Sequence, residues 1–433
     1  MPLNSIKQKL TSPLSLSPTF GILSSVSPTN LTAKGLNPNV GDIVEIHGNQ
    51  TTLGIVSSSQ ESSFHITPFS FVDGHKSGDK VYLLKSGLTI PMGDFLLGRV
   101  INPLGEPLDQ KGDFPHGSLF PIINPPISAL DRGVIDEIFT TGIKSIDGLL
   151  TSGKGQKMGI FAGSGVGKST LMGMIVRGSN TPIKVIALIG ERGREVPEFI
   201  YNNLRGDLSN TVLVVATSDD SPLMRKYGAF SAMAIAEYFQ NQGHDVLFIM
   251  DSVTRFAMAQ REIGLALGEP PTSKGYPPSS LTLLPQLMER AGKIRDKGSI
   301  TAFFTVLVEG DDLSDPIADQ SRSILDGHIV LSREMTDFGI YPPINIIHSA
   351  SRLSNQLIQD EHKKGTQKFR KLYALLKENE VLIRIGAYQQ GTDPDLDEAI
   401  SKKEWLEDFL KQEEGERFDF DEIQKKLQEI LLK

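Results

Sequence analysis

Apolar residues follow three different patterns along the chain, and each pattern predicts a different kind of structure. In residues 19–95, short runs of alternating apolar and polar residues are separated by Gly and Asn. Strands with one buried and one exposed face show this alternation, so we predict a small β-barrel for this segment. The expected strands are 42–48, 51–59 and 80–87.

The middle region, residues 96–349, begins with a stretch rich in Pro and Gly and then alternates apolar runs with helical patterns. The runs are nearly continuous in apolar residues, which is typical of strands buried on both faces. This pattern predicts an α/β fold with a mostly parallel sheet covered by helices. The expected strands are 157–163, 184–190, 211–217, 245–251 and 300–308.

Residues 350–433 are predicted to form a helical domain. One set of apolar residues falls at spacings i, i+3, i+4 and i+7, which places them on one face of a helix. This set is Phe369, Leu372, Tyr373 and Leu376. A second set near the end of the chain is Ile423, Leu427, Ile430 and Leu431.

Residues 1–18 allow two interpretations. Leu3, Ile6 and Leu10 are spaced for one helical face, so the segment fits a short amphipathic helix that docks on a partner or a lipid surface. A terminus without fixed structure fits the same residues equally well.

Composition narrows the possible functions. The net charge is −8, from 44 Lys and Arg against 52 Asp and Glu, which argues against a general nucleic-acid coat. The absence of cysteine excludes disulfides, thiolate nucleophiles and zinc held by cysteine. No apolar stretch approaches the roughly 20 residues of a membrane span, and the start of the chain lacks the apolar core of a secretory signal. We therefore expect a cytoplasmic protein that is peripheral to a membrane at most.

The strongest chemical motif is a glycine-rich loop between an expected strand and an expected helix. The loop AGSGVGKST occupies residues 162–170, and it begins with Ala where the strict phosphate-binding pattern has Gly. Its glycines let backbone N–H groups approach phosphates, the lysine contacts the β- and γ-phosphates, and the serine hydroxyl ligates Mg²⁺. The nucleotide-binding residues expected here are Gly163, Ser164, Gly165, Val166, Gly167, Lys168, Ser169 and Thr170.

Two acidic residues lie just after expected strands. Asp251 ends the run 245–251, and Glu191 follows the run 184–190. Ligands bind at the carboxyl ends of strands in open α/β sheets, so Asp251 is expected to hold Mg²⁺ and Glu191 to activate the attacking water. Arg192 is then a candidate phosphate contact. Taken alone, the segment ERGRE fits a surface charge cluster, but the nearby glycine-rich loop favours the catalytic interpretation.

Several longer motifs resemble, in the same order, those of the ring ATPases related to the catalytic β subunit of the rotary ATP synthase. They are GRVINPLGEPLD (98–109), TGIKSIDGLL (141–150), GERGRE (190–195) and DSVTRF (251–256). Within this family, residues 268–292 and 382–400 are most similar to the type III export ATPases, and the GAY wording within 382–400 resembles the flagellar enzymes more than those of virulence injectisomes. The β subunit of the synthase has a different acidic segment in place of 382–400. The resemblance covers nearly the whole chain.

The resemblance implies an architecture and further site residues. The architecture is an N-terminal β-barrel, a RecA-like nucleotide-binding domain and a C-terminal helical domain, with ATP and Mg²⁺ bound. By motif position, Arg255 lies near the phosphates and Arg352 is the arginine finger given to a neighbouring subunit. Tyr341 stacks on adenine, although its place beside two prolines fits simple packing equally well without the resemblance.

The resemblance also implies partners. We expect a homo-hexameric ring that hydrolyses ATP to power export of flagellar proteins by releasing chaperones and unfolding or loading substrates. Its partners are a stator-like regulator at the N-terminal segment, a coiled-coil central stalk protein, export-gate membrane proteins and chaperone–substrate complexes. The loop 309–316 matches the family loop that faces the stalk. We place the protein at the inner face of the bacterial inner membrane and expect no specific nucleic acid.

Four other interpretations remain beside this one. One is an ATPase of a virulence injectisome, since the preference for the flagellar type rests on few residues. A β-type synthase subunit needs a non-catalytic partner, whereas Glu191 and Arg352 in one chain favour a self-sufficient ring. The acidic net charge argues against a nucleic-acid translocase. A structural subunit without turnover has no need of Glu191.

Overall fold

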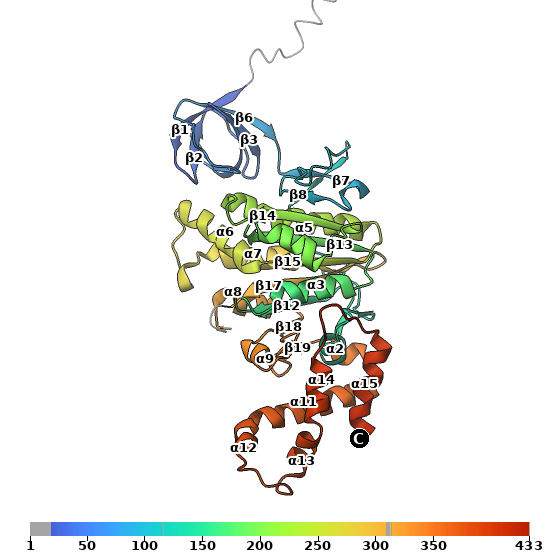
Figure 1. Ribbon diagram of the computed structural model, residues 1–433. Coiled ribbons are helices and arrows are strands. Elements are labelled where there is room, and N and C mark those ends of the chain that lie inside the picture. Colours follow the sequence, from blue (N-terminus) through green and yellow to red (C-terminus); the bar gives the residue numbers. More distant parts are fainter. Residues whose placement is uncertain (1–18, 116, 309–311, 313, 433) are drawn as a thin grey trace, which may run out of the picture. The chain divides into compact units, whose positions relative to one another are not determined.

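The computed structural model describes residues 19–115, 117–308, 312 and 314–432 (Figure 1). The chain divides into two compact units, Met1–Leu88 and Thr89–Lys433. The predicted docking segment 1–18 and most of the predicted stalk-facing loop, residues 309–311 and 313, lie outside the described residues.

The first unit contains a closed six-stranded barrel, as predicted from the alternation. Each strand pairs antiparallel with its neighbours, and alternate residues such as Leu31 and Ala33 are fully buried in the barrel interior. Closure leaves no unpaired strand edge. In order around the barrel the strands are β1 (Phe20–Val26), β2 (Leu31–Lys34), β5 (Phe64–Pro68), β4 (Thr51–Ser59), β3 (Ile43–His47) and β6 (Lys80–Lys85).

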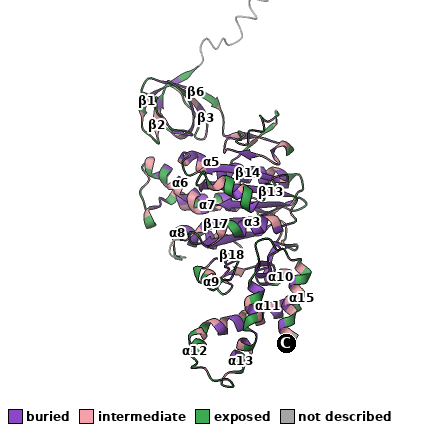
Figure 2. Cartoon of the chain, viewed as in Figure 1, coloured by how far each residue is buried: buried purple, intermediate pink, exposed green. Residues whose placement is uncertain are grey.

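The second unit is built on a nine-stranded sheet, and the five strands predicted from apolar runs form its centre. All residues of β12 and β15 are buried, which explains their continuous apolar sequence (Figure 2). From β18 to β8 the neighbouring strands are parallel, while β19 and β16 (Gly292–Lys293) are antiparallel additions. In order the strands are β19 (Ala350–Ser351), β18 (Gly327–Val330), β12 (Lys157–Ala162), β17 (Ser299–Leu307), β15 (Val246–Asp251), β13 (Ile183–Glu191), β14 (Thr211–Thr217) and β8 (Val100–Ile101).

Helices cover both faces of this sheet. Ile186 and Leu188 of β13 share a hydrophobic core with α3 (Lys168–Gly178), whereas a Cβ on Gly228 of α5 (Pro222–Asn241) would meet Ile189. Adjacent residues of a strand point to opposite faces, so α3 and α5 cover opposite sides. Three further helices pack among themselves and with α5: α6 (Val253–Ala266), α7 (Pro278–Met288) and α8 (Pro316–Ile324).

The C-terminal region is helical, and both predicted apolar stripes face the core, although Leu431 of the second stripe is only partly buried. Phe369, Leu372, Tyr373 and Leu376 of α11 (Asp360–Glu378) are buried, as are Ile423, Leu427 and Ile430 of α15 (Phe420–Leu432). They continue the core that contains α3. The remaining helices here are α9 (Arg333–Asp337), α10 (Ser354–Leu357), α12 (Glu380–Arg384), α13 (Pro394–Ser401) and α14 (Lys403–Leu410). In the part of the chain that the structure describes, no helix combines the length and apolarity of a membrane span.

The Pro- and Gly-rich stretch after the barrel is more ordered than its composition indicates. β7 (Thr89–Met92) pairs with β9 (Ser118–Pro121), and β8 joins the edge of the main sheet. Arg99 donates to both carboxylate oxygens of Asp109 at 2.7 and 2.9 Å, closing the loop between them. This pairing holds the pKa of Asp109 well below its usual range.

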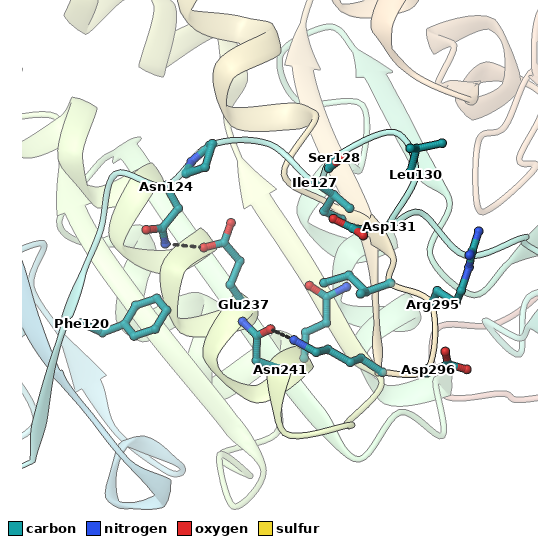
Figure 3. Close-up of a pocket in the computed structure, with 14 residues that line it drawn as sticks. Phe120, Asn124, Ile127, Ser128, Leu130, Asp131, Glu237, Asn241, Arg295 and Asp296 are labelled. Atoms are coloured by element: carbon teal, nitrogen blue, oxygen red, sulfur yellow. Dashed lines mark hydrogen bonds between the residues drawn. The ribbon is translucent and has the colours of Figure 1, made fainter.

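A buried ion pair ties this stretch to α5. The Arg290 side chain is fully buried and donates to both oxygens of Glu237, at 2.6 and 2.7 Å. It also donates to the Ile122 carbonyl, while Asn124 donates to Glu237 at 2.7 Å (Figure 3). These polar atoms lose their contacts with water when they are buried, and the hydrogen bonds within the network replace those contacts.

Replacing one partner of this pair should destabilise the fold. In Glu237→Gln the buried guanidinium loses its counter-charge, which costs about 3 kcal/mol or more, so the midpoint of thermal unfolding should fall clearly. Asp395→Asn is the matched control, because its pair with Lys371 is about half exposed (57% and 53%) and should contribute less than about 1 kcal/mol. An equal fall in the unfolding midpoint of the two variants would contradict the prediction that the buried pair contributes more to stability than the exposed pair.

Candidate functional site

The glycine-rich loop connects β12 to α3, as the sequence predicts. Gly165 and Gly167 have φ angles of 76° and 95°, a left-handed conformation that other residues adopt with strain. Gly167 is also the N-cap of α3, so the loop delivers unpaired backbone N–H groups at a helix N-terminus. Such a terminus attracts anions, and phosphates above all.

Three predicted residues meet at the carboxyl ends of β12, β13 and β15. The ammonium group of Lys168 forms a short ion pair with Asp251 and lies 3.5 Å from a carboxylate oxygen of Glu191. The side chains are 11%, 4% and 17% exposed, respectively. One cation therefore lies between two carboxylates in a largely dry environment.

The charged groups of this cluster shift the pKa values of Glu191 and Lys168. Burial, and after it the charge of Asp251, raise the pKa of Glu191 to about 7 against the opposing effect of Lys168. Burial alone would lower the pKa of Lys168, but the charges of Asp251 and Glu191 outweigh it and raise that pKa. A carboxylate with a pKa near neutral is well matched to accepting a proton at physiological pH.

A bulge in β13 aims Glu191 at this cluster. The pairing register with β14 shifts between Ile189 and Glu191, and Gly190 between them has a φ of 76°. A Cβ at Gly190 would lie 2.7 Å from the Cβ of Arg255. The glycine is therefore needed both for the turn and for the close approach of α6, and bulges of this kind commonly redirect a side chain next to active sites.

Two cavities flank the loop. The first, of about 310 Å³, is lined by Ser169 together with acidic and amide side chains: Glu191, Glu195, Glu198, Asn202, Asn203 and Asp251. The second, of about 350 Å³, is lined by Gly167, Thr170 and Met174 on one side and by Tyr341, Pro342 and Pro343 on another. The acidic cavity suits a metal and water, whereas the second offers an aromatic ring beside the loop.

The second cavity also includes residues of the C-terminal region. Lys411, Gln412, Glu413 and Glu414 line it, and the main-chain N–H of Gln412 donates to the Tyr341 carbonyl at 2.7 Å. The side chain of Gln412 bonds to the backbone of Lys144 and Gly142. The helical region is thus fixed to the same wall that carries Tyr341.

The donor set of the acidic cavity fits Mg²⁺. A serine hydroxyl and a carboxylate are hard oxygen ligands, and Mg²⁺ usually takes its other ligands from water and substrate phosphates. Among the described residues no group of three or more acidic, histidine or cysteine side chains could hold a metal by itself. The residues present therefore fit a metal that binds with a phosphate compound.

The other predicted residues lie in three different environments. Arg255 is on α6 and packs against Gly190, and its buried Nε has no hydrogen-bond partner within the described part of the chain. Arg192 is 69% exposed and lies 3.9 Å from Glu195, outside the Lys168 cluster, so its contact with phosphate stays a prediction. Tyr341 is half exposed at the mouth of the second cavity.

Arg352 lies near the amino-terminal ends of the parallel strands, which we call the amino edge of the sheet. The glycine-rich loop lies at their carboxyl ends, the carboxyl edge. Its main-chain N–H donates to Asp326, which in turn bonds to Lys157 at the start of β12. The loop follows Ala162 at the other end of β12, roughly 16 Å further along the strand. Arg352 is therefore not placed to reach the phosphate site of its own chain.

Several site residues gave no signal in the sequence. Thr305, in the middle of β17, donates to the same oxygen of Asp251 that Lys168 contacts, at 2.7 Å. Arg333 of α9 donates to the Ser164 carbonyl, and Asn203 donates to the Ser169 carbonyl, so both hold the loop from outside. Each of these contacts joins residues more than thirty positions apart, and local pattern carries no information about them.

A larger cavity of about 620 Å³ lies elsewhere (Figure 3). It is lined by residues 120–131, the end of α5 and the loop 294–297. Neither the glycine-rich loop nor Glu191 and Asp251 line this cavity. Although it is larger than the two cavities beside the loop, it is therefore not the candidate catalytic site.

Comparison with known proteins agrees with this geometry. Residues 142–351 match the nucleotide-binding domain of the ATP synthase alpha/beta family, and residues 358–429 match the T3SS EscN ATPase C-terminal domain. The chain is 66% identical over the full length of both chains to the flagellum-specific ATP synthase of Helicobacter pylori strain J99.

Two solved structures are also similar. The assembled ATPase EscN from the enteropathogenic E. coli type III secretion system is 43% identical, with a TM-score of 0.91 over 95% of this chain and 100% of that chain. EscN in complex with its central stalk EscO is 42% identical, with a TM-score of 0.89 over 95% of this chain and all of that one. Both confirm the predicted three-part fold.

The contact between Thr305 and Asp251 should matter for turnover. Thr305→Val removes a hydrogen bond to a charged group, worth about 1.5–3 kcal/mol, and frees Asp251 to rotate. We expect kcat to fall roughly 10- to 100-fold and the Mg²⁺ concentration for half-maximal rate to rise. Thr305→Ser keeps the hydroxyl and should restore most of the rate; a Ser variant as poor as the Val variant would refute this role.

Proposed function

This chain belongs to the ATP synthase alpha/beta family, among its flagellar and type III export ATPases, and we propose how its residues carry out the reaction. It is an enzyme that hydrolyses ATP in type III protein export, and the similarity favours the flagellar system. The prediction of an export ATPase over a synthase β subunit is confirmed by the match of residues 358–429. The observation that carries the catalytic proposal is the Lys168–Asp251–Glu191 cluster beside the glycine-rich loop.

In the proposed mechanism, residues 163–170 bind the nucleotide phosphates. Backbone N–H groups of the loop and the start of α3 contact the phosphate oxygens, and Lys168 exchanges its carboxylate partners for the β- and γ-phosphates. Tyr341 packs against the adenine ring, with Met174 lining the same cavity. These contacts position the terminal phosphoryl group without a covalent intermediate.

Ser169 and Asp251 would hold Mg²⁺, which when bound neutralises charge on the β- and γ-phosphates. Thr305 orients Asp251 for this task. Glu191 accepts a proton from the attacking water, for which its raised pKa is suitable. Arg192 and Arg255 are further proposed phosphate contacts.

The site of one chain is proposed to be completed by the next. Arg352 lies at the amino edge of the sheet, so its guanidinium can reach a nucleotide only on a neighbouring chain. A head-to-tail contact of this kind closes into a ring, and we propose a homo-hexamer. A central stalk is supported by the similarity to EscN in complex with its central stalk EscO.

The remaining assignments are also proposals. We place the enzyme in the cytoplasm at the inner face of the bacterial inner membrane, beside export-gate membrane proteins and chaperone–substrate complexes. Residues 1–18 would bind a stator-like regulator. The functional segments we propose are 1–18, 19–95, 96–349 and 350–433.

The first experiment is ATP turnover per chain as a function of protein concentration. If each site needs Arg352 of a neighbour, the rate per chain should rise with concentration and then saturate. Glu191→Gln serves as the blank, because it should bind ATP almost normally while kcat falls at least about 100-fold. A rate that stays flat at the level of the blank would mean that a different protein completes the site.

A second experiment tests the adenine contact. Tyr341→Ala should raise KM for ATP roughly 10-fold, because an aromatic stack on a base is worth about 1–3 kcal/mol, with little change in kcat. Tyr341→Phe keeps the ring and should behave as the native chain. An unchanged KM in the Ala variant would leave Tyr341 a packing residue.

A further inference from the structure

The amino edge of the sheet carries three arginines around one histidine. Arg352 donates through its guanidinium to the main-chain carbonyl of Arg322 at 3.1 Å, so these two residues lie side by side. Arg370 of α11 donates to the Ser349 carbonyl at 2.9 Å, just before the finger. Burial lowers the pKa of His328, and the charges of all three arginines lower it further, which places them within electrostatic reach of the ring.

Other basic side chains on this edge are neutralised by acids. Lys154 lies 2.9 Å from Glu137, and Lys157 lies 2.9 Å from Glu289. The three arginines differ: within the described residues, which leave out 309–311 and 313, none of them forms an ion pair with a carboxylate. Their positive charge is therefore available to an anion from outside the chain.

The three arginines are not equivalent. Arg370 is largely buried and uses its guanidinium to hold carbonyls, which positions the segment that leads to Arg352. Arg322 is half buried in the last turn of α8, and no hydrogen bond of its guanidinium occurs among the described residues. It is thus the arginine beside Arg352 whose donors have no partner among the residues that the structure describes.

We infer that Arg322 is a second cation that each chain contributes to the nucleotide phosphates bound by its neighbour. The inference rests on the proposed head-to-tail ring, in which the amino edge of one sheet faces the carboxyl edge of the next. The carboxyl edge holds the glycine-rich loop and an anionic nucleotide, so the arginine surface meets a surface of opposite charge. Two guanidinium groups can share the charge that spreads over the phosphoryl oxygens during transfer.

A purely structural role for Arg322 makes a different prediction. A cation in the last turn of α8 interacts favourably with the helix dipole, and its removal would then affect only the stability of its own chain. The difference between the two roles lies in which chain is affected. A mixture of two inactive variants can therefore separate them.

The experiment mixes Arg322→Ala with Glu191→Gln chains before assembly. Each variant alone should turn over slowly, with Arg322→Ala reduced roughly 10- to 100-fold in kcat. An interface needs Glu191 from one chain and Arg322 from the next, so equal random mixing leaves about one interface in four intact. We expect turnover to recover towards a quarter of the native rate. Arg322→Lys keeps the charge but not the forked geometry, and should lose less than the Ala variant.

Control mixtures keep this inference separate from the proposed function. Arg352→Ala mixed with Glu191→Gln should recover in the same way, which tests the finger itself. Recovery with Arg352→Ala but not with Arg322→Ala would overturn the role of Arg322 and leave the ring intact. Failure of both mixtures would refute the shared site altogether.

Two measurements that do not depend on turnover complete the test. Light scattering should give Arg322→Ala the same assembled mass as the native chain, and its unfolding midpoint should be nearly unchanged. The affinity of the assembled variant for a fluorescent ATP analogue should fall while that of the dilute, unassembled chain does not. A lost assembly mass, or an equal loss of affinity in dilute chains, would assign Arg322 to packing instead.

Discussion

Parallel strand pairing is the constraint on which this site depends. Because β12, β17, β15 and β13 run in one direction, their carboxyl ends share one edge of the sheet, and Lys168, Asp251 and Glu191 meet there. The same parallel order places Arg352 at the other edge. A single chain cannot bring both sets of charges together, so the fold itself separates Asp251 and Glu191 from Arg352 by the length of a strand.

Much of this arrangement could be predicted from the sequence because its determinants are local. Fewer than twenty neighbouring residues are enough to recognise each of these features: a buried strand, the glycine-rich loop or a helical stripe. Thr305 shows the limit: it is one of three hydroxyl-bearing residues in β17, and its partner is on another strand. Arg333 likewise reaches the loop, and Gln412 reaches Tyr341, only through tertiary packing, and no local pattern distinguishes them from surface residues.

The exposed position of Arg192 shows a second limit. A motif assigns residues to one site, but adjacent residues after a strand point in different directions, so Glu191 turns into the cluster while Arg192 faces solvent. The bulge at Gly190 determines which of them enters. Motif spacing predicts that this segment lies beside the glycine-rich loop, whereas the direction of each side chain depends on a backbone irregularity.

The wall formed by Tyr341 and Gln412 has a thermodynamic consequence. Residues 411–414 belong to the helical region, yet they line the same cavity as Gly167 and Thr170. A ligand in that cavity that contacts residues 411–414 favours the position of the helical region in which those contacts form. Linkage is reciprocal, so a protein that displaces this region changes the affinity for nucleotide by the same factor by which nucleotide changes the affinity for that protein. A force that moves the helical region and a nucleotide that fills the cavity would then both act on the same conformational equilibrium.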